Sequence, residues 1–355
     1  MIASGLTIVC TLAILAVIPA MSIQYREFLD RTGLRASIGL TALVSAASLA
    51  VWVAASLFVT DVAASPLEWP TAALAAVGGF LASLTVRDTT SRALPALLFS
   101  IGWTLFVFVP IAVVVLFPAS VGIPVTAGPL DLGGALPVQV AVGSGALVVL
   151  TLARNWAVED RSHVRPRPWL FLASGFVIWA GWLLGFVGLE LTVDAVVTPR
   201  IVLSSLIAPV FGVFGWLLAE RILTARTTPF GAVAGLLCGL VSVSAGSAYL
   251  TPLWAGVTGA IAGIACGVFV IRRVEKTGRH AWLIVGVHLV AAIVGLLLVG
   301  LFGLGTGFIF DGQPALFELQ LVSILGVMVW SGLVSLLLWL GVRQLARRSH
   351  RFVAR

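Results

Sequence analysis

Long apolar segments separated by short polar loops follow one another along the whole chain. With a window of roughly 19 residues, the length of a helix that crosses a bilayer, the hydropathy pattern predicts eleven transmembrane helices. They are expected near residues 4–23, 36–60, 70–86, 93–117, 131–153, 168–188, 198–223, 229–249, 252–272, 282–305 and 317–342. Because every connection is short, we expect one all-α transmembrane domain over residues 1–355 and no separate soluble domain.

The composition leads to the same class of protein. Hydrophobic residues make up 60% of the chain and charged residues 10%, with a mean hydropathy of +1.13. Soluble domains carry about a quarter charged residues, so a soluble enzyme or a nucleic-acid-binding module is excluded. Cys10, Cys238 and Cys266 lie far apart in apolar segments, which is typical of small buried residues. The sequence therefore predicts no disulfide framework, no metal site and no cofactor.

The basic residues are distributed unevenly between the two ends of the predicted helices. Of the 21 lysines and arginines, all but Arg200 fall in alternate loops and in the basic tail 343–355. The positive-inside rule then places the N-terminus outside and the C-terminus in the cytoplasm, which requires an odd number of helices. The first apolar segment has no basic residue before it and no small-residue cleavage site after it, so we expect a retained helix. The net charge of +7 needs no nucleic-acid partner.

The predicted helices divide into two halves of five, 4–153 and 168–305, followed by the eleventh helix at 317–342. Two segments with an odd number of crossings run through the membrane in opposite senses, which is the inverted repeat of many transporters. Small residues recur every fourth position in two helices, which predicts close backbone packing. They are Gly231, Gly235 and Gly239, and then Gly259, Gly263 and Gly267.

A few polar residues fall where the membrane is dry. His288 and Gln139 lie at similar depths in the last helix of each half, so they are expected to meet near the axis that relates the halves. The alternative for His288 is a hydrogen bond to a backbone carbonyl. Asp131 opens the fifth helix and is expected to cap it, and Ser244 either bonds back to its own helix or lines a cavity.

Several segments together resemble the ammonium transporter (Amt/Mep/Rh) family. The similarity is strongest from residue 170 onward, and the segments that carry it are IPAMSIQY (18–25), GFVIWAGW (175–182), GWLLAER (215–221), GAVAGLLCGLVSVSAGSAYLTPLWAGVTGAIAGIACG (231–267), VGVHLVAAIVGLLLVGLF (285–302) and LQLVSILGVMVWSG (319–332). The resemblance implies eleven helices with an outside N-terminus, an inverted repeat of five plus five, and a multi-pass protein of the prokaryotic plasma membrane. It also implies a homotrimer with one pore in each subunit.

The family's pore contains two histidines in contact, and only one has a counterpart here. In the register of the resemblance, His288 matches the second histidine, and the first falls on Gln139. Asp131 matches the family's aspartate, Ser244 a threonine or serine of the eighth helix, and Trp182 a tryptophan close to the histidines.

The family's outer cation site is substituted. Its tryptophan falls on Leu116, its serine on Leu189, and its two gating phenylalanines on Gly185 and about Ala75. Phe186 lies one residue from the gate position and compensates if the helix is locally shifted. The acidic and glycine-containing tail motif that helps to dock a PII-type regulator is missing, so no such partner is expected.

A Gln–His pair keeps half of the family's proton chemistry. An amide can fix the tautomer of an imidazole, but it cannot take up a proton. The hypothesis is a pore that conducts ammonia or ammonium, with weak selectivity for the cation, or that conducts another small neutral molecule. Two alternatives stay open. The first is a non-transporting family member that acts as a sensor or structural subunit. The second is a membrane enzyme, for which the chain offers no carboxylate pair and no ligand cluster.

Overall fold

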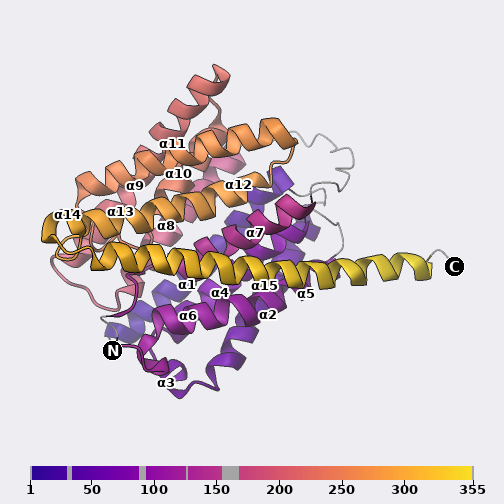
Figure 1. The fold of residues 1–355 in the computed structure, drawn as a ribbon, viewed down its shortest axis with the longest axis horizontal. Helices are drawn as coiled ribbons and strands as arrows, with labels where there is room; N and C mark the ends of the chain where they lie inside the picture. The colour runs from indigo at the N-terminus through magenta and orange to yellow at the C-terminus, as the bar shows by residue number, and fades with distance from the viewer. Residues whose placement is uncertain (1, 30–33, 88–92, 125–126, 154–167, 354–355) are drawn as a thin grey trace.

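The computed structural model describes residues 2–29, 34–87, 93–124, 127–153 and 168–353, and within these ranges it contains helices and no strand. The helices run side by side in one bundle (Figure 1). The first half contains α1 (Ile2–Leu29), α2 (Leu34–Ser56), α3 (Thr60–Ala63), α4 (Glu68–Arg87), α5 (Ala93–Trp103), η1 (Thr104–Phe108), α6 (Val109–Leu116), η2 (Pro118–Val121), η4 (Ala135–Val140) and α7 (Ala141–Leu152). The rest contains α8 (Pro168–Leu189), α9 (Val197–Thr224), α10 (Pro229–Val243), α11 (Pro252–Thr277), α12 (Trp282–Ile284), η6 (Val285–Val290), α13 (Ala291–Phe302), α14 (Phe308–Asp311) and α15 (Ala315–Val353).

The predicted class of fold, an all-α polytopic membrane protein, is confirmed. In the described residues, 10 helical stretches are long and apolar enough to cross a membrane, and each coincides with a predicted helix. The remaining predicted helix, 229–249, corresponds to α10, which ends at Val243 and is followed by turns. The count of eleven crossings therefore stays a prediction.

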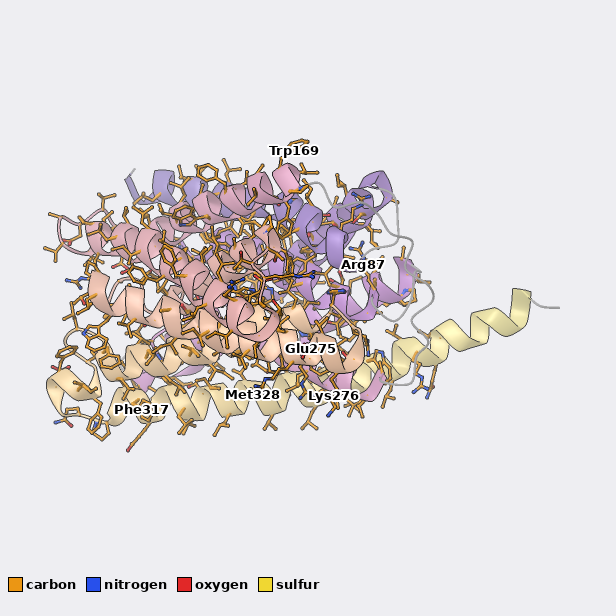
Figure 2. The ribbon with its side chains drawn as sticks, turned by 90° about the horizontal axis from the view of Figure 1, so that it is seen from above. Arg87, Trp169, Glu275, Lys276, Phe317 and Met328 are labelled. Atoms are coloured by element: carbon orange, nitrogen blue, oxygen red, sulfur yellow. The ribbon has the colours of Figure 1, made fainter. Side chains whose placement is uncertain are left out.

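The two ends of the chain lie at opposite ends of the bundle. α1 begins at one end, and α15 protrudes from the other (Figure 1). Figure 2 shows Arg87, Glu275 and Lys276 toward the protruding end of α15, and Phe317 toward the opposite end. An odd number of crossings produces this arrangement, and which end faces the cytoplasm stays a prediction. Several basic residues behind that prediction lie outside the described residues, namely Arg31, Arg92, Arg154, Arg161, Arg165, Arg167 and Arg355.

The glycine repeats hold α9, α10 and α11 together, as the sequence predicts. A Cβ on Gly239 would lie 2.2 Å from the carbonyl oxygen of Ala208, and one on Gly259 would lie 2.1 Å from the same atom. A Cβ on Gly263 would lie 2.2 Å from the carbonyl oxygen of Gly212 in α9. No larger residue fits at these crossings without moving a backbone, so glycine sets the distance between the helices.

Helix α15 is longer than predicted. The sequence predicts a helix over 317–342 and then a basic tail, whereas α15 runs 39 residues from Ala315 to Val353. At 1.5 Å per residue it spans about 58 Å, well beyond the roughly 30 Å of a hydrocarbon core. Ser331 of α15 donates to the carbonyl of Ala141 at 2.5 Å, which fixes α15 against the start of α7.

Candidate functional site

A histidine and a glutamine meet in the apolar centre of the bundle. His288 Nδ1 lies 2.5 Å from Gln139 Oε1, and the two side chains are 0% and 2% exposed. The structure thus brings together the two polar residues that the sequence places at corresponding depths. A backbone carbonyl is not the partner of either ring nitrogen of His288.

The two residues lie in two similar irregular helix turns. Gln139 lies in the π-helical segment η4, which leads into the 12-residue helix α7. His288 lies in the π-helical segment η6, which leads into the 12-residue helix α13. π-Helical turns are rare and occur frequently at functional sites, because the wider turn redirects a side chain. Here both turns direct a polar side chain to the same point.

A third polar group completes the cluster. The hydroxyl of Tyr25, near the end of α1, lies 2.6 Å from His288 Nε2, and Tyr25 is 1% exposed. Gln139, His288 and Tyr25 therefore form one hydrogen-bonded row, which we call the central row. Three different helical segments contribute to it.

The hydrogen bonds of the central row fix the state of the imidazole. The amide oxygen of Gln139 can only accept, so His288 Nδ1 carries a hydrogen and donates it. In the neutral ring Nε2 is then an acceptor, and it accepts the hydroxyl hydrogen of Tyr25. Both ring nitrogens of His288 thus have a partner of the matching kind, and the arrangement suits a neutral histidine.

Asp131 and Ser244 hydrogen-bond to the backbone. The carboxylate of Asp131 accepts from the backbone N–H groups of Ala135 and Leu136, each at 2.7 Å, and so anchors the start of η4. Ser244 donates to the carbonyl of Val241 in its own helix at 2.7 Å, the first of its two predicted arrangements. Neither residue hydrogen-bonds to the central row in the described part of the chain.

Trp182 of α8 packs on Phe186. The two ring centroids lie 5.6 Å apart, and both side chains are buried. A Cβ placed on Gly133 would lie 2.6 Å from Phe186 Cε1 and 2.6 Å from the carbonyl oxygen of Ser244. Phe186 therefore points toward the loop before η4 and the end of α10, the segments next to the start of the Gln139 helix.

Gly185 faces a different helix from Phe186. Its carbonyl accepts a hydrogen bond from the Cys10 thiol at 3.2 Å, and a Cβ at this position would lie 3.1 Å from Ile14 of α1. A larger side chain at position 185 would meet α1 instead of the interior that Phe186 reaches.

The other substituted positions bring no polar group to the bundle. Leu116 is half-buried at the end of α6, Leu189 is buried at the end of α8, and Ala75 is buried within α4. Among the described residues, no group of three or more His, Cys, Asp or Glu side chains is placed to hold a metal ion.

Sequence reasoning did not assign Tyr25 to the site. The chain contains only two tyrosines, and one of them ends the apolar first helix, where a hydroxyl at membrane depth needs a partner. That signal was available, but the partner is 263 positions away in sequence. Only the folded bundle identifies His288 as the acceptor.

The fold and the central row define a polytopic helical membrane protein with a hydrogen-bonded polar centre inside an apolar bundle. Comparison with known proteins gives the family. The model of the Ammonium Transporter Family matches residues 71–348. The chain belongs to the ammonium transporter family, and it is a multi-pass plasma-membrane protein.

Individual relatives agree with this assignment. The chain is 31% identical over 264 residues to an ammonium transporter of Mycobacterium tuberculosis (strain ATCC 25618 / H37Rv), covering 68% of this chain and 54% of that protein. It is 29% identical over 250 residues to an ammonium transporter of Bacillus subtilis (strain 168), covering 67% and 60%. The matches thus span little more than half the length of these relatives.

Solved structures share the fold. The chain is similar to Saccharomyces cerevisiae Mep2, with a TM-score of 0.78 and 19% identity over 94% of this chain and 86% of that one. It is also similar to a protein described as "Sensor Amt Protein", with a TM-score of 0.73 and 16% identity over 97% and 93%.

Proposed function

We propose that this protein conducts ammonia across the plasma membrane through a pore within each chain. The observation that carries the proposal is the central row, three hydrogen-bonded polar side chains that are almost fully buried in an apolar bundle. Polar groups at membrane depth are costly to bury and mark the paths of ions and substrates. Membership of the ammonium transporter family supports ammonium or ammonia as the substrate class.

The form of the substrate follows from the groups in the row. Ammonium is a cation that would need several oxygen partners or a negative charge in place of its lost water. Gln139 offers an amide, which takes up no proton, and the Tyr25 hydroxyl keeps its own hydrogen at neutral pH, so His288 is the only base in the row. A neutral molecule needs only hydrogen bonds. We therefore assign ammonia as the conducted species, with the proton left outside.

The outer end of the path supports the same assignment. In the register of the resemblance, Leu116, Leu189 and Gly185 fall at the positions of the family's outer cation site, and none of them offers a hydroxyl or an aromatic face. We further propose that Phe186, which packs on Trp182 and lies near Gly133, closes the outer side of the row. Asp131 holds the start of η4 and so positions Gln139. The backbone carbonyl of Ser244 lies, with Phe186, against Gly133 in the loop before η4.

The symmetry of the chain supports a path between two inverted halves, 4–153 and 168–305. Gln139 and His288 each lie in a π-helical segment that precedes a 12-residue helix, at corresponding places in the two halves. α7 and η6 pack together, so the two halves meet at the row. We further propose a homotrimer, as the resemblance implies, with α15 as the eleventh crossing.

The test measures charge movement and ammonia permeation separately. Purified protein in liposomes is subjected to an ammonium jump on a solid-supported membrane, and internal alkalinisation is followed in a stopped-flow instrument. We expect no ammonium current above that of a potassium jump, and alkalinisation faster than in empty liposomes. His288→Ala should abolish the faster alkalinisation, and Gln139→His should add a current by supplying a second titratable group.

Two results would overturn the proposal. A transient ammonium current in the unchanged protein that His288→Ala removes would mean that charge crosses. Alkalinisation no faster than in empty liposomes would mean that the protein does not transport. A non-transporting sensor would then be favoured, a role named in one of the proteins that share the fold.

A further inference from the structure

A buried thiol bonds to the π-helical segment that carries His288. Cys266 of α11, which is 0% exposed, donates its thiol hydrogen to the backbone carbonyl of Gly286, with 3.0 Å between sulfur and oxygen. Gly286 lies in η6, two residues before His288. A Cβ on Gly286 would lie 2.2 Å from Val270 Cγ2, so the backbone of η6 lies directly against α11. Cys266 and Val270 are four residues apart and therefore face η6 from the same side of α11.

The thiol bonds to the irregular part of the helix. In a regular α-helix a carbonyl pairs with the N–H four residues on, whereas the Gly286 carbonyl accepts from the N–H of Ala291, five residues on. A carbonyl oxygen can accept two hydrogen bonds, and the thiol of Cys266 supplies the second. A side chain that inserts into the hydrogen-bond ladder of a helix makes the helix depart from regular geometry. The thiol therefore favours the π-helical form of η6 over a regular turn.

The helix α7 holds η6 from another side. A Cβ on Gly143 would lie 2.5 Å from the Cβ of Leu289, the residue after His288. α7 follows directly from η4, which carries Gln139. The position of η6 against α11 and α7 thus sets how the His288 ring meets the Gln139 amide.

The other π-helical segment has a similar bond. The hydroxyl of Ser331 in α15 donates to the carbonyl of Ala141, two residues after Gln139, at 2.5 Å. Cys266 donates to a carbonyl two residues before His288. In both halves, a side chain from a neighbouring helix thus bonds the backbone close to a member of the central row.

We propose that Cys266 is a positioning residue, whose bond to the Gly286 carbonyl holds η6 in the conformation that directs His288 Nδ1 to the amide of Gln139. The inference rests on the proposed function where it concerns permeation, and it adds to that function a residue outside the central row. Without the thiol hydrogen, η6 is free to relax toward a regular α-helical turn, which rotates His288 away from Gln139. The bond between the two side chains then lengthens or breaks, and ammonia loses a well-placed partner.

The test follows two readouts in Cys266→Ala. Ammonia permeation is measured as internal alkalinisation of liposomes. The nitrogen NMR resonance of His288 Nδ1, identified by its loss in His288→Ala, reports the bond to Gln139 whether or not the protein transports. A thiol is a weak donor, so permeation is expected to slow about two- to fivefold, and the resonance should shift. Cys266→Ser keeps a donor and should restore both readouts.

The chain offers a matched control in Cys238→Ala. Cys238 is also 0% exposed and lies beside Cys266, on α10, but it donates to no backbone carbonyl among the described residues. This change should leave both readouts as they are. Cys266→Val fills the space without a donor, so it should behave as Cys266→Ala does and takes its place if that variant does not fold.

The combination of variants decides between the bond and the volume of the side chain. Slower permeation and a shifted resonance in Cys266→Ala, restored by serine and absent in Cys238→Ala, support the positioning role. Equal effects in Cys266→Ala and Cys238→Ala, or no recovery in Cys266→Ser, would mean that only the buried volume matters, and the inference fails. An unshifted resonance, or a shift without slower permeation in a protein that conducts, overturns it as well. If the unchanged protein does not conduct, the proposed function fails, and the resonance alone decides the role of Cys266.

Discussion

The hydroxyl of Tyr25 gives the sharpest test of the central row, because one substitution removes it without changing the ring. Tyr25→Phe leaves His288 Nε2 buried without its donor, while Gln139 still accepts from Nδ1. No cavity forms, since phenylalanine fills the same space. The change therefore isolates one hydrogen bond of 2.6 Å between two residues that are 1% and 0% exposed.

The expected cost follows from the burial of the acceptor that is left behind. A buried polar atom that loses its partner costs about 1–3 kcal/mol of unfolding free energy, more than the net value of an average hydrogen bond. His288 is 0% exposed, so we expect a cost within this range. The free energy of unfolding is measured in mixed micelles with increasing denaturing detergent, followed by tryptophan fluorescence.

The chain supplies its own matched control. Tyr249 is the second of the two tyrosines and is 36% exposed, so Tyr249→Phe should change the unfolding free energy by less than about 0.5 kcal/mol. In a His288→Ala background, Tyr25→Phe should lose most of its cost, because the bond is already gone. If Tyr25→Phe costs no more than Tyr249→Phe, or costs the same in both backgrounds, the central row does not exist as described.

Three further changes probe the elements that hold the row. Gly143→Ala places a Cβ 2.5 Å from the Cβ of Leu289, so it should lower the free energy of unfolding by about 1–3 kcal/mol and slow ammonia permeation. Gly326→Ala is the control, because a Cβ there meets nothing within 4 Å and the change should be neutral. Equal stability of the two variants would contradict the close contact of α7 with η6. Asp131→Ala removes two bonds to backbone N–H groups and should cost about 0.5–2 kcal/mol in the same unfolding assay, with Asp131→Asn intermediate. Arg279→Met removes a buried guanidinium that donates to two carbonyls at the end of α7, so it should lower the free energy of unfolding by about 1–3 kcal/mol. An unchanged free energy of unfolding would mean that Arg279 does not hold the helix that follows Gln139.

The helices were predictable because the bilayer leaves few choices. A backbone in hydrocarbon must pair its own polar groups, so an apolar segment of sufficient length is a helix, and 10 predicted segments are such helices in the described residues. The glycine repeats were equally informative, since no other residue permits the contacts between α9 and α11. The end of α15 was not predictable in this way, because charged residues after 342 end a hydropathy window without ending a helix.

The site was predicted in part. The pairing of Gln139 with His288 followed from their depth in two segments, and the structure brings the two side chains together. Hydropathy carries no information on π-helical turns, so η4 and η6 could not be foreseen. Tyr25 was missed because a contact between α1 and η6 depends on how distant helices pack.

The residues assigned to the outer site lack a group that would bind a cation, and those at the centre of the bundle lack a second group that would take up a proton. A site that recruits a cation needs oxygen or aromatic partners, and the residues that the resemblance assigns to that site, Leu116 and Leu189, provide neither. A relay between two imidazoles needs a second base at depth, and neither the amide of Gln139 nor the protonated hydroxyl of Tyr25 is one. What the chain does offer at its centre is a row of neutral hydrogen-bonding groups, the amide of Gln139, the imidazole of His288 and the hydroxyl of Tyr25. Each can exchange a hydrogen bond with ammonia, and none compensates a positive charge. Weak recruitment of the cation and an incomplete proton relay are therefore compatible with transport, provided that the neutral gas is what crosses.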